Sequence, residues 1–67
     1  MDLVQEMLKY ADYLYKKAFA LCGEENDAKD LVQETYLSAL IFIKKGNDIQ
    51  NVKSYLLQIM KNKYIDM

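Results

Sequence analysis

The chain of 67 residues contains no proline, histidine, tryptophan or arginine, and it has only two glycines and one cysteine. With so few chain breakers, long helices are favoured over a fold of strands and tight turns. A lone cysteine cannot form an intramolecular disulfide and fits a reducing compartment. Without histidine or a glycine-rich loop, the common catalytic arrangements are missing. We therefore expect no enzyme, no metal site and no cofactor.

Apolar residues make up 52% of the chain, but lysines or acids interrupt every apolar run. No stretch is long enough to predict a membrane span. The chain begins Met1-Asp2, without the basic segment of a secretory signal. We therefore expect one small cytoplasmic domain over residues 1–67.

Three segments show helical spacing of apolar residues, over about residues 3–22, 27–45 and 52–66. Asp2 is a suitable N-cap for the first segment, and Gly23 is suited to close it. These segments predict an all-α fold, a small three-helix bundle. The expected core stripe of the first helix is Leu3, Met7, Leu8, Ala11, Leu14, Tyr15, Ala18, Leu21 and Cys22.

Asn26 or Asp27 is the expected N-cap of the second helix, which should end near Lys44-Lys45-Gly46. A loop over residues 46–51 follows. The third helix should begin near Asn51 or Val52, and its apolar pattern continues to Met67 without a stop signal. We therefore expect a fragment of a longer protein, or a gene product cut short within a helix. The expected core stripe of this helix is Val52, Tyr55, Leu56, Ile59 and Met60.

The second helix has two apolar sides when its residues are placed 100° apart. One is an ordinary core stripe. The other combines Leu37 and Ile41 with polar neighbours, whereas a solvated face would carry only polar residues. This pattern favours docking on a partner, although a missing helix or a second copy of the chain would also cover it. The outer side comprises Asp30, Gln33, Glu34, Leu37 and Ile41.

Charge is distributed unevenly along the chain. Residues 1–43 hold four lysines and eight acids, whereas residues 44–67 hold five lysines and two acids. Such polarity could orient a domain between a basic protein surface and a phosphate backbone, or be surface scatter. Lys61 beside Asn62 could contact phosphate and a base edge respectively. Both residues would also be ordinary on a solvated helix.

The run Asp27-Ala28-Lys29-Asp30-Leu31-Val32-Gln33-Glu34-Thr35-Tyr36 resembles the signature of region 2 of bacterial RNA polymerase sigma factors, especially the extracytoplasmic-function (ECF) type. The run Ser54-Tyr55-Leu56-Leu57-x-Ile59-Met60-x-Asn62-x-x-Ile65-Asp66 is similar to the next helix of that family and follows at the family's spacing. Together the two motifs span most of the chain.

The resemblance implies that the helix over residues 27–45 docks on the clamp-helix coiled coil of the polymerase β′ subunit. Matching positions are Asp30, Gln33 and Glu34, and the two-sided pattern adds Leu37 and Ile41. The resemblance also implies that the next helix and the preceding loop open the minus-ten promoter element and hold flipped bases of the nontemplate strand. The implied DNA-binding residues are Lys61 and Asn62, with Gly46, Asn47, Asp48 and Asn51 in the loop.

The chain departs from the family pattern in three ways. Tyr55 stands where the family usually has tryptophan, the arginine-rich continuation after Ile65-Asp66 is absent, and so is the second, helix-turn-helix domain. The alternative interpretation is a non-catalytic helical interaction module, such as a polymerase-binding decoy that never contacts DNA. An anti-sigma factor is a further candidate partner.

Overall fold

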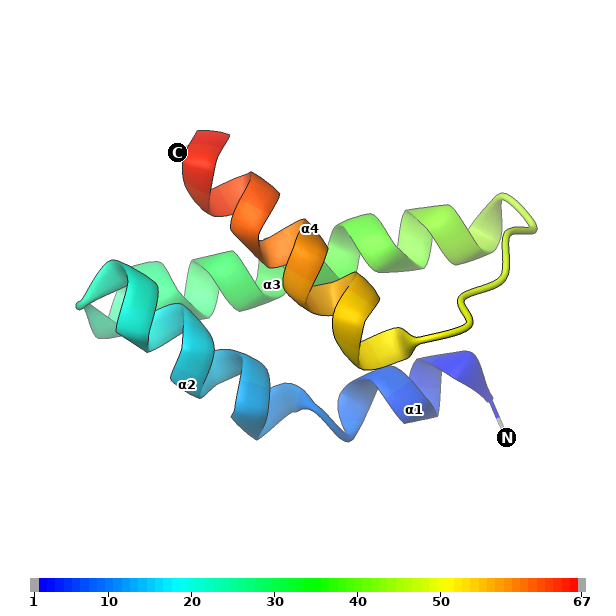
Figure 1. Cartoon of the computed structure of the whole chain (residues 1–67), viewed down its shortest axis with the longest axis horizontal. Coiled ribbons are helices and arrows are strands. Elements are labelled where there is room, and N and C mark those ends of the chain that lie inside the picture. Colours follow the sequence, from blue (N-terminus) through cyan, green and yellow to red (C-terminus); the bar gives the residue numbers. More distant parts are fainter. Residues whose placement is uncertain (1, 67) are drawn as a thin grey trace.

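The computed structural model describes residues 2–66, which form an all-α fold of the predicted class. The helices are α1 (Leu3–Leu8), α2 (Ala11–Cys22), α3 (Glu25–Lys44) and α4 (Val52–Asp66). Helix α3 is the central element, because both α2 and α4 make their most extensive contacts with it. Figure 1 shows α2 returning alongside α3 after a tight turn, α4 crossing α3 obliquely, and α1 near the start of α4. No helix of this part of the chain is long and apolar enough to cross a lipid bilayer.

The prediction of one continuous helix over residues 3–22 is wrong, because the chain breaks at Lys9 and Tyr10. No glycine or proline marks the break. The Tyr36 hydroxyl of α3 donates a hydrogen bond of 2.8 Å to the Met7 carbonyl, which a continuous helix would use for the Ala11 N–H. The Tyr10 N–H instead closes α1 on the same Met7 carbonyl at 3.2 Å. A contact from α3 thus accompanies the division of the predicted bundle's first helix into two.

Two leucines of the predicted core stripe are exposed. Met7, Leu14 and Ala18 of the predicted stripe are fully buried, but Leu8 is 58% exposed and Leu21 is 37% exposed. Both leucines had been placed in the core on the basis of a continuous 3.6-residue period. Leu8 is the last residue of α1, directly before the break. Leu21 lies on the same side of α2 as buried Leu14, so its exposure comes from the hollow between α2 and α4 that it lines.

The turn between α2 and α3 is short and capped on both sides. Gly23 adopts φ 73°, and its N–H donates to the Phe19 carbonyl at 2.8 Å, closing α2 as predicted. Helix α3 begins at Glu25, not at Asp27, and its N-cap is Glu24 in place of Asn26 or Asp27. The Glu24 carboxylate accepts from the backbone N–H groups of Asn26 at 3.0 Å and Asp27 at 2.8 Å. These hydrogen bonds lower the pKa of Glu24.

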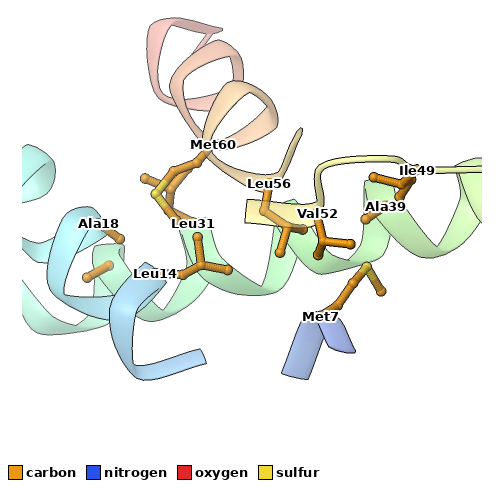
Figure 2. Packing of buried hydrophobic residues seen from close by; sticks show 10 residues of the cluster. Met7, Leu14, Ala18, Leu31, Ala39, Ile49, Val52, Leu56 and Met60 are labelled. Atoms are coloured by element: carbon orange, nitrogen blue, oxygen red, sulfur yellow. The ribbon is translucent and has the colours of Figure 1, made fainter. Parts of the chain in front are cut away.

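The core receives side chains from all four helices and the loop before α4. Figure 2 shows Met7 and Leu14 approaching from α1 and α2, while Val52, Leu56 and Met60 approach from α4. On α3, the buried positions include the small residues Ala28, Thr35 and Ala39, which allow its neighbours to pack closely. The buried Thr35 hydroxyl is satisfied within the helix, donating to the Leu31 carbonyl at 2.7 Å. The core thus uses one side of α3.

We predict that Tyr36→Phe destabilises the fold by about 1 kcal/mol at pH 7, since it removes the hydroxyl that donates to Met7. Burial raises the pKa of Tyr36 in the folded protein above its value in the unfolded chain. The protonated hydroxyl therefore stabilises the fold fully below the ordinary tyrosine pKa, and this stabilisation is lost as pH rises through the pKa of the folded protein. The difference in free energy of unfolding between wild type and Tyr36→Phe should therefore become smaller above about pH 10. Urea unfolding followed by circular dichroism measures both, with Tyr64→Phe as an exposed control. An unchanged gap at alkaline pH would contradict this account.

We predict that Glu24→Gln lowers the melting temperature at neutral pH, because an amide oxygen is a weaker cap than a carboxylate. The pKa of Glu24 is lower in the folded protein than its ordinary value of 4.5. The charged carboxylate therefore stabilises the fold above pH 4.5, and this stabilisation disappears as pH falls through the pKa of the folded protein. Thermal melts of both proteins should therefore converge in acid. Glu34→Gln, which changes an exposed mid-helix carboxylate, is the matched control and should show little effect.

Candidate functional site

The outer face of α3, defined by Asp30, Gln33, Glu34, Leu37 and Ile41, is exposed at all five positions. Leu37 and Ile41 are 53% and 48% exposed, one turn apart. Leu40, which is 38% exposed, adds an apolar side chain that sequence reasoning missed. Leu40 lies about 60° from Leu37 around the helix axis, so placing the residues 100° apart could have identified it from the sequence. The outer face thus combines an apolar end with a polar end nearer the helix start.

The polar end of this face continues onto α4. Asp30 and Glu34 line a shallow hollow together with Lys63 and Asp66, and Leu31 contributes its apolar wall. Three acidic residues and one lysine therefore line one hollow between α3 and the end of α4. No group of three or more His, Cys, Asp or Glu side chains among residues 2–66 is arranged to hold a metal ion. The hollow gives the outer face an acidic border.

The predicted DNA-binding residues fall into two separate groups at opposite ends of α4. Gly46, Asn47, Asp48 and Asn51 lie in the loop before the helix, whereas Lys61 and Asn62 lie in its last turns. All six are exposed. From Asn51 to Lys61 the helix advances about 15 Å at 1.5 Å per residue. The structure therefore places the two groups along one helix and does not join them in one pocket.

Three of the predicted loop side chains make local hydrogen bonds. The Asn47 amide donates to the Phe42 carbonyl at 3.1 Å, at the end of α3. Asp48 Oδ1 accepts from the Ile49 N–H at 2.8 Å, and Asn51 Oδ1 accepts from the Ser54 N–H at 3.1 Å. Each of these bonds shapes the loop or caps a helix. Buried Ile49 anchors the loop to the core.

An aromatic contact also joins the two helices that the loop connects. Tyr55 of α4 packs on Phe42 of α3 with the ring centroids 5.1 Å apart. Burial raises the pKa of the Tyr55 hydroxyl. Tyr55 thus acts here as a packing residue beside the loop.

A second hollow, the α2–α4 groove, was not predicted from the sequence. Lys61, predicted to bind DNA, lies in it, and so does Leu21, which had been assigned to the core. The sequence pattern of one helix cannot predict this groove, because α2 and α4 each contribute half of the lining residues. Its lining consists of Lys17, Ala20 and Leu21 from α2 with Leu57, Met60 and Lys61 from α4.

Cys22 is half-buried at the end of α2. Burial raises the pKa of its thiol, and the carboxylates of Asp27 and Glu24 raise it further. A protonated thiol is a poor nucleophile at neutral pH. The position is therefore one of packing beside the α2–α3 turn.

Comparison with known proteins identifies a family for this chain. The family described as Sigma-70 region 2 matches residues 7–67. The ECF RNA polymerase sigma factor SigE of Mycolicibacterium smegmatis is 34% identical over 64 residues, covering 88% of this chain and 23% of that protein. The chain thus spans about a quarter of the length of this relative. No solved structure matches the chain significantly.

The match includes α3, with its exposed outer face, and α4, with the loop before it. The ECF resemblance read from the two sequence motifs is therefore confirmed by independent comparison. The chain belongs to the Sigma-70 region 2 family, and it is a region 2 of the ECF type.

Proposed function

We propose that this chain acts in transcription initiation as a sigma region 2, docking on the RNA polymerase core and engaging the promoter minus-ten element. The observation that carries the docking part is the exposed apolar end of the outer face, Leu37, Leu40 and Ile41, on a helix whose other side is used by the core. The family membership supports the choice of partner.

The outer face suits docking on a helical partner such as the β′ clamp coiled coil. Leu37 and Ile41 lie one turn apart and can anchor between side chains of a facing helix. Asp30, Gln33 and Glu34 supply hydrogen-bond acceptors and negative charge beside these anchors. A basic partner would find complementary charge there, which favours specificity and fast association.

Promoter opening would be driven by binding energy, with no chemical step. A base that leaves the DNA stack loses a few kcal/mol, which contacts with the protein must offset. Exposed Asn62 can hydrogen-bond a base edge, and exposed Lys61 one position away can bind a phosphate. The loop over residues 46–51, shaped by its own hydrogen bonds, presents its remaining polar groups at the other end of α4.

A second candidate function is a decoy or interaction module that docks on polymerase, or on an anti-sigma factor, without contacting DNA. It is favoured by the local hydrogen bonds of Asn47, Asp48 and Asn51, which occupy the side chains predicted to bind bases. Both functions use the outer face of α3, so only DNA-directed variants separate them.

For docking, we predict that Leu37→Asp and Glu34→Lys each weaken binding to an isolated β′ clamp coiled coil by tenfold or more, about 1.4 kcal/mol. Leu37→Asp places a charge among apolar anchors, and Glu34→Lys reverses a charge beside them. Calorimetry measures the affinities, after circular dichroism has shown that each variant is folded. Leu8→Asp is the matched control, since Leu8 is equally exposed but lies on α1. Undiminished binding by both variants, or no binding by the folded wild type, would refute the docking face.

For promoter opening, we predict that Asn62→Ala and Lys61→Ala reduce strand separation several-fold while leaving clamp binding unchanged. Both residues lie on α4 and not on the outer face of α3, and neither lines the hollow at the polar end of that face. Core polymerase carrying the wild-type chain would first select a promoter from duplexes randomised in the minus-ten element. Permanganate reactivity of its thymines then reports opening. Gln5→Ala, which removes an exposed amide from α1, should behave as wild type. A chain that docks yet selects no promoter would favour the decoy.

A further inference from the structure

The α2–α4 groove is lined by apolar and basic residues. Its apolar lining, here called the floor, comprises Ala20, Leu21, Leu57 and Met60. Exposed Lys17 and Lys61 complete the lining, one from each helix. Among the described residues, none of those lining this groove carries a carboxylate. The hollow between α3 and α4 is different, since Asp30, Glu34 and Asp66 line it. The groove therefore attracts anions.

Tyr13 of α2 brings a third lysine to the same seam. The Lys53 ammonium of α4 lies 4.4 Å from the centroid of the Tyr13 ring, and the Lys17 ammonium lies 5.6 Å from it. Attraction between a cation and a ring face restrains flexible lysine side chains. Lys17 belongs both to this cluster and to the groove. Positive charges that are already positioned bind a ligand with a smaller entropy cost.

The spacing of these lysines suits a chain of phosphates. Lys53 and Lys61 are separated by eight positions on α4, which corresponds to about 12 Å along the axis. A stacked single strand advances about 3.4 Å per nucleotide, so the seam spans about three to four nucleotides. The apolar floor between the lysines can contact base faces, as in other single-strand grooves.

We propose that the α2–α4 groove binds single-stranded DNA, with Lys17, Lys53 and Lys61 on its phosphates and Tyr13 as the residue that positions two of them. The proposal rests on the proposed function in its DNA-binding part. It extends the nucleic-acid surface from α4, where Lys61 and Asn62 lie, across the groove to α2. Lys17, Lys53 and Tyr13 would thereby join the DNA-binding residues.

The test is fluorescence anisotropy of the full chain with a labelled, mixed-sequence single-stranded DNA of about twelve nucleotides, starting at low ionic strength. Lys17→Gln and Lys53→Gln should each weaken binding several-fold. Each should also reduce the slope of log affinity against log salt by about 0.7, the value for one lost phosphate contact on a single strand. Lys16→Gln is the matched control, because the exposed Lys16 is adjacent in sequence but does not line the groove. Unchanged slopes for Lys17→Gln and Lys53→Gln, or no DNA binding by the wild type, would overturn the proposal.

Tyr13 is tested by Tyr13→Leu and Tyr13→Phe. If the ring positions the lysines, Leu should weaken DNA binding and Phe should restore most of it, while both variants keep wild-type circular dichroism spectra. If Tyr13→Leu bound the DNA with the same affinity as wild type, Tyr13 would have no role in DNA binding.

Two further measurements separate this inference from its alternatives. Binding to the β′ clamp coiled coil should be the same for Lys17→Gln, Lys53→Gln and wild type, so a failure of docking would leave the groove proposal standing. Polyglutamate should compete poorly with the labelled DNA, because it lacks flat apolar bases for the groove floor. Equally effective competition by polyglutamate would overturn the nucleic-acid assignment in favour of an acidic peptide.

Discussion

The packing of two helices against one side of α3 is the constraint on which the rest of the structure depends. Ala28, Leu31, Thr35 and Ala39 are buried there, and their small average size brings α2 and α4 close to the α3 backbone. Because both neighbouring helices pack on the same side of α3, the residues on its opposite side remain outside the core. Leu37, Leu40 and Ile41 are exposed for this reason, and the proposed docking surface is a direct consequence of how the core is built.

The same arrangement gives α4 two different environments. Near its end, Lys63 and Asp66 line a hollow together with the acids of α3. On the side that faces α2, Leu57, Met60 and Lys61 meet Lys17 across an apolar floor. A domain that is nearly neutral overall, with a net charge of −1, thus presents an acidic border beside one proposed interface and a basic groove at another. This separation would let one small domain face a basic protein surface and a nucleic acid together.

Several features were predictable from the sequence because they depend on residues a few positions apart. The all-α fold, the closing role of Gly23 and the two-sided character of α3 follow from helical periodicity and local capping. The motifs around Asp30 and Asn62 were sufficient to indicate the family. The N-cap of α3 was misassigned because Glu24 was not considered, although its longer side chain reaches two backbone N–H groups.

Other features were decided only by tertiary structure, because they join residues that are distant in sequence. The break at Lys9 and Tyr10 accompanies a hydrogen bond between Tyr36 and Met7, which are 29 positions apart. The pairing of Lys53 with Tyr13 depends on how α4 crosses α2, and no helical pattern contains that angle. Local chemistry therefore determined that the chain is helical and which face of α3 is unusual. The packing of those helices decided which leucines reach solvent and which lysines share a groove, since burial depends on neighbours supplied by other parts of the chain.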